Sequence, residues 1–316
     1  MSVVPRQRTT LYSEAVVLLG HRGAVFTATF SSDGTSLVSG GLDASVRFWR
    51  LPTDEYEPTP NYAVLEGHKS AVTSLAWKDV STLFSTCADA SVAFWDASTG
   101  ERVRRGVGHS DTVNDCSARA GVCVSVADDG CVCVWDDRTK LPVRTVLSPY
   151  PVLCCDLSAD GTTAYVSGID TAVRAIDLGS GKTVWSCLAG REAVTGLAVS
   201  SDGSRAVLRL ADGLVTALNV SHVVPADVSR VGPTYGGLAL DAGPNLVRVC
   251  FSRDDVSVAA GSDASQTFVW NTASRRLRAR FEDHRAAVLD VSFHPTENII
   301  LLCSADGDII VRQMAD

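Results

Sequence analysis

The residues of this chain that could carry out chemistry are His, Ser, Asp and Trp residues that recur in three sets. In each set an Asp follows the Ser by four positions and a Trp follows the Asp by six. The sets are His21, Ser39, Asp43 and Trp49; His68, Ser85, Asp89 and Trp95; and His109, Ser125, Asp129 and Trp135. A Ser nucleophile, a His base and an Asp that orients the His are the groups of a hydrolase triad. Any one set, taken alone, would predict acyl transfer.

The repetition of these sets favours a structural role over catalysis. A hydrolase needs one exposed nucleophile beside one oxyanion site, whereas three equivalent sets are typical of a scaffold that solves the same packing problem three times. We therefore predict no catalytic residues and a protein that is not an enzyme.

Metal and cofactor chemistry are not indicated by the remaining motifs. The chain contains ten cysteines but no C-x-x-C pair, so the spacing of zinc and redox motifs is missing. No Gly-rich phosphate loop and no His/carboxylate metal motif stands out. We expect the cysteines to be free, buried thiols and predict no metal and no cofactor.

Composition restricts the class of partner. The chain has 316 residues, of which 46% are hydrophobic and 20% charged, as is typical of globular proteins. Its 28 Lys and Arg against 36 Asp and Glu give a net charge of −8, so general attraction to nucleic-acid phosphates or anionic lipid is not expected. No apolar run reaches the ~20 residues of a membrane helix, and residues 1 to 15 do not resemble a secretory signal. RNA contact is expected to be indirect at most.

The elements that position the repeated sets are short strands. Gly-His pairs at positions 20, 67 and 108 and the Trp residues that close apolar stretches recur about every 40 residues, and weaker copies extend the pattern to seven units. Alternating apolar stretches are separated by turns such as Ser31-Ser32-Asp33-Gly34. No segment has a sustained 3.6-residue apolar period. The pattern predicts an all-β protein of seven four-stranded units.

A period of this length with Gly-His and Trp-Asp landmarks resembles the WD-repeat family. The resemblance implies a single seven-bladed β-propeller over residues 1–316. It also implies that each repeated set forms a buried hydrogen-bond chain from the Asp through the His to the Ser and the indole. The apolar stretch of residues 15–19 precedes the first Gly-His pair and the last unit lacks a fourth strand, so we predict that these two pair and close the ring.

Residues that the repeat does not require are candidates for partner binding. Loops next to the Gly-His pairs and before the turn Asp residues are expected to line one face of the propeller, with Tyr150 as its most anchor-like residue. The residues expected on this face are Arg22, Leu42, Lys69, Ala88, Asp111, Asp128, Tyr150, Arg191 and Arg285. Two connectors, residues 52–60 and 221–245, exceed the repeat and are expected to be loops.

Several segments outside the general repeat pattern resemble a spliceosomal branch of the family. They include Asn61-Tyr62-Ala63, Ala193-Val194-Thr195-Gly196-Leu197 and Phe293-His294-Pro295. The resemblance implies a nuclear component of the U5 small nuclear ribonucleoprotein, monomeric within a larger complex. In that branch the propeller docks against the very large core U5 scaffold protein, near the GTPase and helicase subunits. The resemblance therefore implies a scaffold in pre-mRNA splicing.

A second interpretation uses the same fold in another role. Trp135-Asp136-Asp137-Arg138 fits the W-D-x-R pattern of substrate receptors of cullin-type ubiquitin ligases, in which the Arg contacts the adaptor. Arg138 would have that role here. Since fold alone does not fix function, both interpretations remain open at this point.

Overall fold

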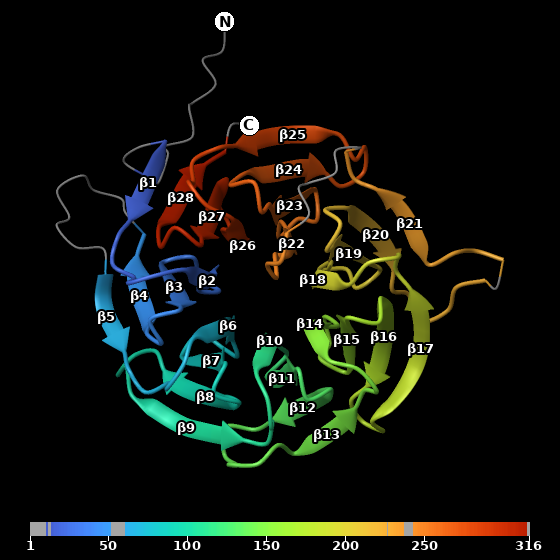
Figure 1. The fold of residues 1–316 in the computed structure, drawn as a ribbon, viewed down its shortest axis with the longest axis horizontal. Helices are drawn as coiled ribbons and strands as arrows, with labels where there is room; N and C mark the ends of the chain where they lie inside the picture. The colour runs from blue at the N-terminus through green and yellow to red at the C-terminus, as the bar shows by residue number, and fades with distance from the viewer. Residues whose placement is uncertain (1–10, 12–13, 52–60, 226, 237–242, 315–316) are drawn as a thin grey trace, which may run out of the picture.

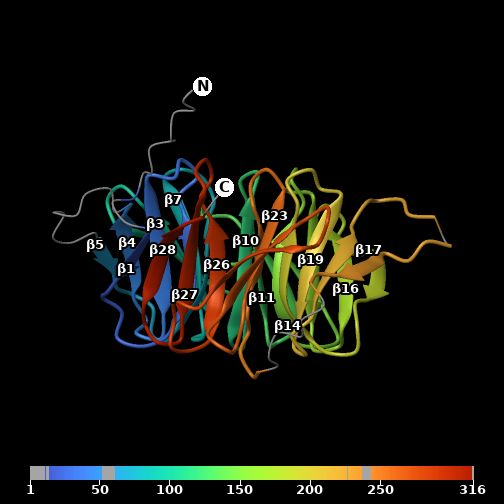
Figure 2. The same ribbon diagram turned by 90° about the horizontal axis from the view of Figure 1, so that it is seen from above.

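Seven four-stranded antiparallel sheets are arranged as blades around a central axis (Figure 1). The computed structural model describes residues 11, 14–51, 61–225, 227–236 and 243–314. Seen from the side, the strands run through the thickness of a disc (Figure 2). The seven-bladed all-β propeller expected from the sequence is confirmed.

The strands follow one another blade by blade, from the innermost strand outward. Blade one contains β2 (Val25–Phe30), β3 (Ser36–Gly41), β4 (Val46–Arg50) and β5 (Asn61–Leu65); blade two contains β6 (Val72–Trp77), β7 (Thr82–Cys87), β8 (Ser91–Asp96) and β9 (Arg102–Val107). Blade three contains β10 (Val113–Arg119), β11 (Val122–Ala127), β12 (Cys131–Trp135) and β13 (Arg144–Leu147); blade four contains β14 (Val152–Leu157), β15 (Thr163–Gly168), β16 (Ala172–Asp177) and β17 (Lys182–Leu188). Blade five contains β18 (Val194–Val199), β19 (Arg205–Leu210), β20 (Val215–Asn219) and β21 (Val231–Thr234); blade six contains β22 (Val249–Phe251), β23 (Ser257–Gly261), β24 (Thr267–Asn271) and β25 (Leu277–Phe281). Blade seven contains β26 (Val288–Phe293), β27 (Ile299–Ser304), β28 (Ile309–Gln313) and, from the start of the chain, β1 (Ala15–Leu18).

The core consists of apolar layers between neighbouring blades. Val38 and Phe48 of blade one pack with Leu75, Leu83 and Trp95 of blade two, and all five are buried. The middle strands are covered on both faces by the adjacent blades, which explains why β7 and β8 read as nearly continuous buried runs. Outer strands such as β9 and β17 alternate or are exposed. Each blade is therefore stabilised by apolar contacts with the two blades next to it.

The ring closes between the two ends of the chain. Strand β1 pairs antiparallel with β28, with Ala15 opposite Arg312 and Leu18 opposite Ile309. Val16 and Leu18 are buried in a cluster that also contains residues of blades one and seven. Arg312 adds ion pairs to Glu14 at 2.9 Å and to Asp283 at 2.8 Å. The predicted closure is confirmed, and the strand ends one residue earlier than expected.

The two connectors have different outcomes. Residues 52–60 lie outside the described residues. The second connector, 221–245, was wrongly expected to be loop throughout, because Val231–Thr234 forms β21, the outer strand of blade five. Gly232 and Pro233 hide this strand in the sequence, and the outer edge is where a sheet tolerates a Pro. Arg230, just before it, lies 4.1 Å from the ring centre of Trp185 on β17 of blade four.

Two further expectations concern the cysteines and the membrane. All ten cysteines are free, and seven of them are buried. Among the described residues, no helix has the length and apolar character to cross a membrane.

Candidate interaction surface and the side-chain networks beneath it

In blade one the first repeated set forms a continuous hydrogen-bond chain. Trp49 Nε1 on β4 donates to Ser39 Oγ on β3 over 2.8 Å, and Ser39 Oγ lies 2.7 Å from His21 Nε2. His21 Nδ1 lies 3.0 Å from the Asp43 carboxylate. Burial lowers the pKa of His21 below its ordinary value of 6.5 despite the attraction of Asp43, which favours the neutral imidazole at pH 7. Its Nδ1–H therefore donates to Asp43, and its Nε2 accepts from the Ser39 hydroxyl.

Asp43 ties this chain to two loops. Its carboxylate accepts from the backbone N–H of Arg22, next to the Gly-His pair, and from that of Ser45, beyond the tight turn. Burial alone would raise the pKa of Asp43, but the hydrogen bonds of Ser45 and Arg22 hold it at about 2. The turn needs this support because Ala44 has a φ of 62°, a conformation that is unfavourable for residues with a Cβ.

Blade three repeats the same chain. Trp135 Nε1 donates to Ser125 Oγ over 2.7 Å, Ser125 Oγ lies 2.7 Å from His109 Nε2, and His109 Nδ1 lies 3.2 Å from Asp129. Burial lowers the pKa of His109, as it does for His21. The two networks are equivalent and are connected only through the blades between them.

Blade seven has half of the chain. His284 Nδ1 lies 3.1 Å from Asp306, which also accepts from the backbone N–H of Arg285. Leu302 and Arg312 occupy the Ser and Trp positions. Consequently His284 Nε2 is buried without a hydrogen-bond partner.

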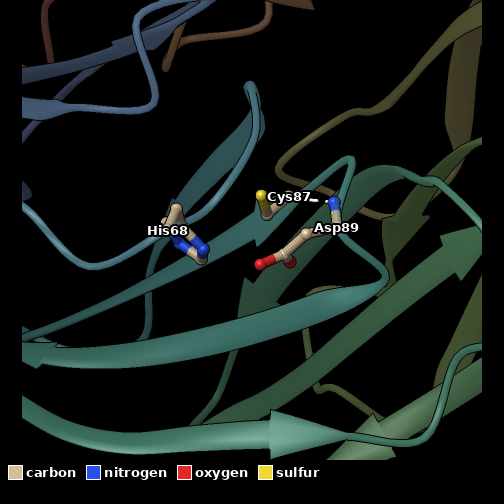
Figure 3. Close-up of side chains that lie close together, drawn as sticks. All are labelled: His68, Cys87 and Asp89. Carbon is tan, nitrogen blue, oxygen red and sulfur yellow. Dashed lines mark hydrogen bonds between the residues drawn. The ribbon is translucent and has the colours of Figure 1, made fainter.

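Blade two departs from the pattern at the carboxylate. His68 Nε2 lies 2.7 Å from Ser85 Oγ, and Trp95 Nε1 donates to the same oxygen over 2.8 Å. However, among the described residues no hydrogen bond joins His68 to Asp89. The Asp89 carboxylate accepts instead from Ser91 and, more weakly, from the Lys69 N–H at 3.3 Å and from Arg105 at 3.5 Å. Cys87 lies in the same corner (Figure 3).

The geometry of these sets does not suit nucleophilic catalysis. Ser39, Ser85 and Ser125 are each 0% exposed, and each accepts from an indole N–H. A substrate carbonyl could reach none of these hydroxyls without displacing a Trp from the core. The arrangement instead anchors loops at one edge of the disc, because the Asp carboxylates accept hydrogen bonds from the backbone N–H groups of these loops.

Most of the residues expected to line one face lie in the loops and turns of blades one, two, three and seven, whereas Tyr150 and Arg191 precede β14 and β18 in blades four and five, which have no His–Asp pair among the described residues. The backbone N–H groups of Leu42, Ala88 and Asp128 donate to carbonyls just before the innermost strands of their own blades. The Gly-His loops and the tight turns therefore meet at the same edge of the disc. Leu42 is 57% exposed and Tyr150 49% exposed. Arg22, Lys69, Asp111, Arg191 and Arg285 are also exposed, whereas Ala88 and Asp128 are half-buried. Asp128 accepts a 2.7 Å hydrogen bond from the Asn114 side chain.

Arg138, the residue of the W-D-x-R pattern, lies between β12 and β13 of blade three. Its side chain is 84% exposed and pairs with both oxygens of Asp136, with Nε at 2.9 and 3.1 Å. The guanidinium is accessible to solvent but is paired with the Asp136 carboxylate.

Sequence reasoning missed one residue that organises the centre of the ring. Arg248, just before β22, reaches from blade six across the axis and donates to the carbonyl oxygens of Phe26, Thr73 and Asn114, on the innermost strands of blades one, two and three. It also pairs with Asp115 at 3.1 Å and Asp290 at 3.4 Å. Burial opposes the charge of Arg248, but these two carboxylates raise its pKa above the ordinary value. Burial raises the pKa of Asp290. The only sequence signal is a charged residue set between Val247 and Val249.

Comparison with known proteins identifies the repeat. The family described as "WD domain, G-beta repeat" matches residues 13–50, 60–96, 100–136 and 275–312. These segments cover blades one and two, the three inner strands of blade three, the outer strand of blade six, and blade seven through β28. The fold and the networks together define a WD-repeat β-propeller.

Several curated relatives extend over nearly the whole chain. The U5 small nuclear ribonucleoprotein 40 kDa protein of Mus musculus is 36% identical over 98% of this chain and 86% of its own length. The pre-mRNA-splicing factor cwf17 of Schizosaccharomyces pombe is 31% identical over 94% of this chain and 86% of its own length. The U5 small nuclear ribonucleoprotein 40 kDa protein of Dictyostelium discoideum is 29% identical over 99% of this chain. The chain belongs to the WD-repeat family of U5 small nuclear ribonucleoprotein 40 kDa proteins.

Proposed function

We propose that this protein is a non-enzymatic scaffold of the U5 small nuclear ribonucleoprotein that acts in pre-mRNA splicing in the nucleus. The observation that carries the proposal is the 36% identity to the Mus musculus U5 40 kDa protein over 98% of this chain. A chain that lacked a blade or its surface turns would not align with this relative over so much of its length. The buried serines of the repeated sets support a role without catalysis.

The partner we propose is the very large core scaffold protein of U5, with the GTPase and helicase subunits nearby. The candidate contact surface is the loop edge that holds Leu42, Lys69 and Tyr150. The exposed side chains of Leu42 and Tyr150 lie among charged residues, and an apolar centre with a polar rim is typical of protein interfaces. The Asp carboxylates of blades one and two bond the loops that hold Arg22 and Lys69 before binding, so little ordering entropy opposes association at these loops. With a net charge of −8, contact with RNA is proposed to be indirect at most.

A binding experiment with point variants tests this surface. The purified full chain is titrated with the purified core U5 scaffold protein, and the dissociation constants of wild type and of the Leu42→Glu and Tyr150→Ala variants are compared. Loss of a well-packed anchor costs ~2 kcal/mol, about a 30-fold weakening. Val80→Glu is the matched control, because Val80 is 73% exposed in a turn at the opposite edge of the disc. Equal affinity of all variants contradicts the assignment of this edge.

The ubiquitin-ligase role is the competing outcome. An accessible Arg138 favours it, but its pairing with Asp136 would have to open for an adaptor to bind. Retention of a cullin and its adaptor by the wild type, lost in Arg138→Ala, together with an absence of U5 proteins, would favour this alternative over the splicing role.

A further inference from the structure

The corner of blade two that contains His68, Cys87 and Asp89 differs from its counterparts in a way that points to a ligand. The potential ligand atoms of the three side chains all lie within 4.8 Å of one another (Figure 3). In blades one, three and seven the equivalent His and Asp are joined directly by hydrogen bonds of 3.0 to 3.2 Å. In blade two that bond is missing, and a thiol lies beside the two unjoined groups.

We infer that His68, Cys87 and Asp89 form a binding site for a zinc ion. Zinc takes His nitrogen, Cys thiolate and carboxylate oxygen as ligands in a tetrahedral arrangement, and a thiolate in the set disfavours Mg²⁺ and Ca²⁺. Three protein ligands leave the fourth position for water. One thiolate and one carboxylate balance the two charges of the ion.

The hydrogen bonds around His68 leave the correct nitrogen free. Nε2 is taken by Ser85 Oγ at 2.7 Å, so Nδ1 is the nitrogen available to a metal. Ser85 has an acceptor of its own in the Ala93 carbonyl oxygen at 3.4 Å, and among the described residues no such bond is found for the serines of blades one and three. Ser85 can therefore accept Nε2–H from His68 while donating to Ala93. This tautomer leaves the Nδ1 lone pair unprotonated and gives the imidazole the outer hydrogen bond that orients metal-binding histidines.

The thiol is placed to become a ligand without disturbing the turn. Cys87 Sγ donates to the Ser70 carbonyl oxygen at 3.2 Å and accepts from the Asp89 N–H at 3.4 Å. When zinc binds, the S–H bond breaks, the proton leaves to solvent and the sulfur bonds the metal, while the bond from Asp89 N–H can persist.

The separations are compatible with a small closing movement. Zinc bonds of ~2.0 to 2.3 Å at tetrahedral angles need ligand atoms about 3.3 to 3.6 Å apart. Asp89 Oδ1 is bonded by the backbone N–H and the hydroxyl of Ser91, whereas Oδ2 has only long contacts to the Lys69 N–H and to Arg105. Rotation of this carboxylate shortens its own distances to His68 and Cys87, and side-chain adjustment of His68 and Cys87 supplies the rest of the closing movement. The three ligands belong to the Gly-His loop, the end of β7 and the turn that follows it, all within blade two, so no blade needs to move.

Sequence spacing could not reveal such a site, because Cys87 follows His68 by 19 positions and no C-x-x-C pair is present. The chain nevertheless supplies its own control. Blade seven has Ser304 at the position of Cys87, and Ser304 makes the equivalent bonds to the Ala286 carbonyl oxygen and from the Asp306 N–H. Cys87→Ser should therefore preserve the turn while removing the thiolate.

Cobalt titration of the reduced, metal-free full chain tests the inference. We expect one equivalent of Co²⁺ to produce a thiolate-to-cobalt charge-transfer band that Zn²⁺ abolishes, with proton release on binding. In Cys87→Ser the band should be absent and zinc affinity should fall by ~100-fold or more, beyond the loss caused by removing an outer-shell partner. Cys131→Ser is the matched control, because blades one and two have Ser45 and Ser91 at the equivalent position. This variant should keep the charge-transfer band and the zinc affinity of the wild type. Absence of the band in the wild type, or equal zinc binding by wild type and Cys87→Ser, would overturn the inference.

Discussion

Replacement of Arg248 by Ala should destabilise the whole ring rather than one blade. The guanidinium bonds three carbonyl oxygens of different blades and pairs with Asp115 and Asp290. Its side chain is 18% exposed and those of the two carboxylates about 10%. The variant therefore leaves two poorly solvated charges without a cation.

The size of the effect follows from this loss of charge compensation. Removing one partner of a buried ion pair costs ~3 to 5 kcal/mol. At about 2 °C per kcal/mol for a chain of this size, the melting temperature should fall by ~6 to 10 °C. Burial already raises the pKa of Asp290 with Arg248 present, and its pKa should rise further in the variant. The folded variant then binds a proton more readily than the unfolded chain, so its deficit should shrink as the pH falls through that raised pKa.

Thermal melts at neutral and mildly acidic pH measure both effects. Arg276→Ala is the matched control, since this Arg is exposed on the outer edge of blade six. In Arg248→Met with Asp115→Asn and Asp290→Asn, no orphan charge remains, and more than half of the lost stability should return. A melting temperature of Arg248→Ala equal to that of wild type would refute the reasoning. So would a deficit that is independent of pH and unaffected by the Asn substitutions.

Four further outcomes are expected. Deletion of residues 1–20 removes β1 with its buried Val16 and Leu18, and at ~1.5 to 3 kcal/mol for each side chain it should lower stability by ~3 to 6 kcal/mol in urea unfolding; an unchanged midpoint contradicts closure by this strand. Asp43→Ala leaves two loop N–H groups without an acceptor and should cost ~2 kcal/mol, whereas Glu101→Ala on an exposed turn should cost nothing measurable; equal melting of the two variants argues against the anchoring role. Burial lowers the pKa of His21 and His109 below the ordinary 6.5, so just below pH 6.5 the unfolded chain binds more protons than the folded chain. The free energy of unfolding should therefore rise with pH through this window. In thermal melts, His109→Gln should show a smaller rise than the wild type. Bare U5 RNA should bind weakly at physiological salt in filter-binding assays, and tight binding that weakens steeply with salt is the contrary result.

The repeat made the fold predictable from sequence. Gly-His pairs and Trp49, Trp95 and Trp135 mark the blades because they occupy fixed places in a hydrogen-bond chain that each blade needs. Closure by residues 15–18 followed from counting strands at the two ends. The outer strand of blade five escaped because an edge position permits the Gly and Pro of β21, which a central strand would not.

The departures from the repeat were not predictable, because they depend on contacts between distant segments. Arg248 makes its bonds to carbonyl oxygens, which any sequence supplies, so nothing at positions 26, 73 or 114 marks the contact. In blade two the Asp–His bond is missing although all four residues of the set are present. Asp89 bonds Ser91 and Arg105 much as Asp43 bonds Ser45 and Arg47, so the missing bond reflects the relative placement of His68 and Asp89 in the folded corner and not the residue types.

Affinity purification of the tagged full chain from cells, followed by mass spectrometry, tests the central claim most directly. The account predicts recovery of the large core U5 scaffold protein with the GTPase and helicase subunits, reduced in the Tyr150→Ala variant and unchanged in Val80→Glu. Recovery of a cullin and its adaptor without splicing factors would contradict it.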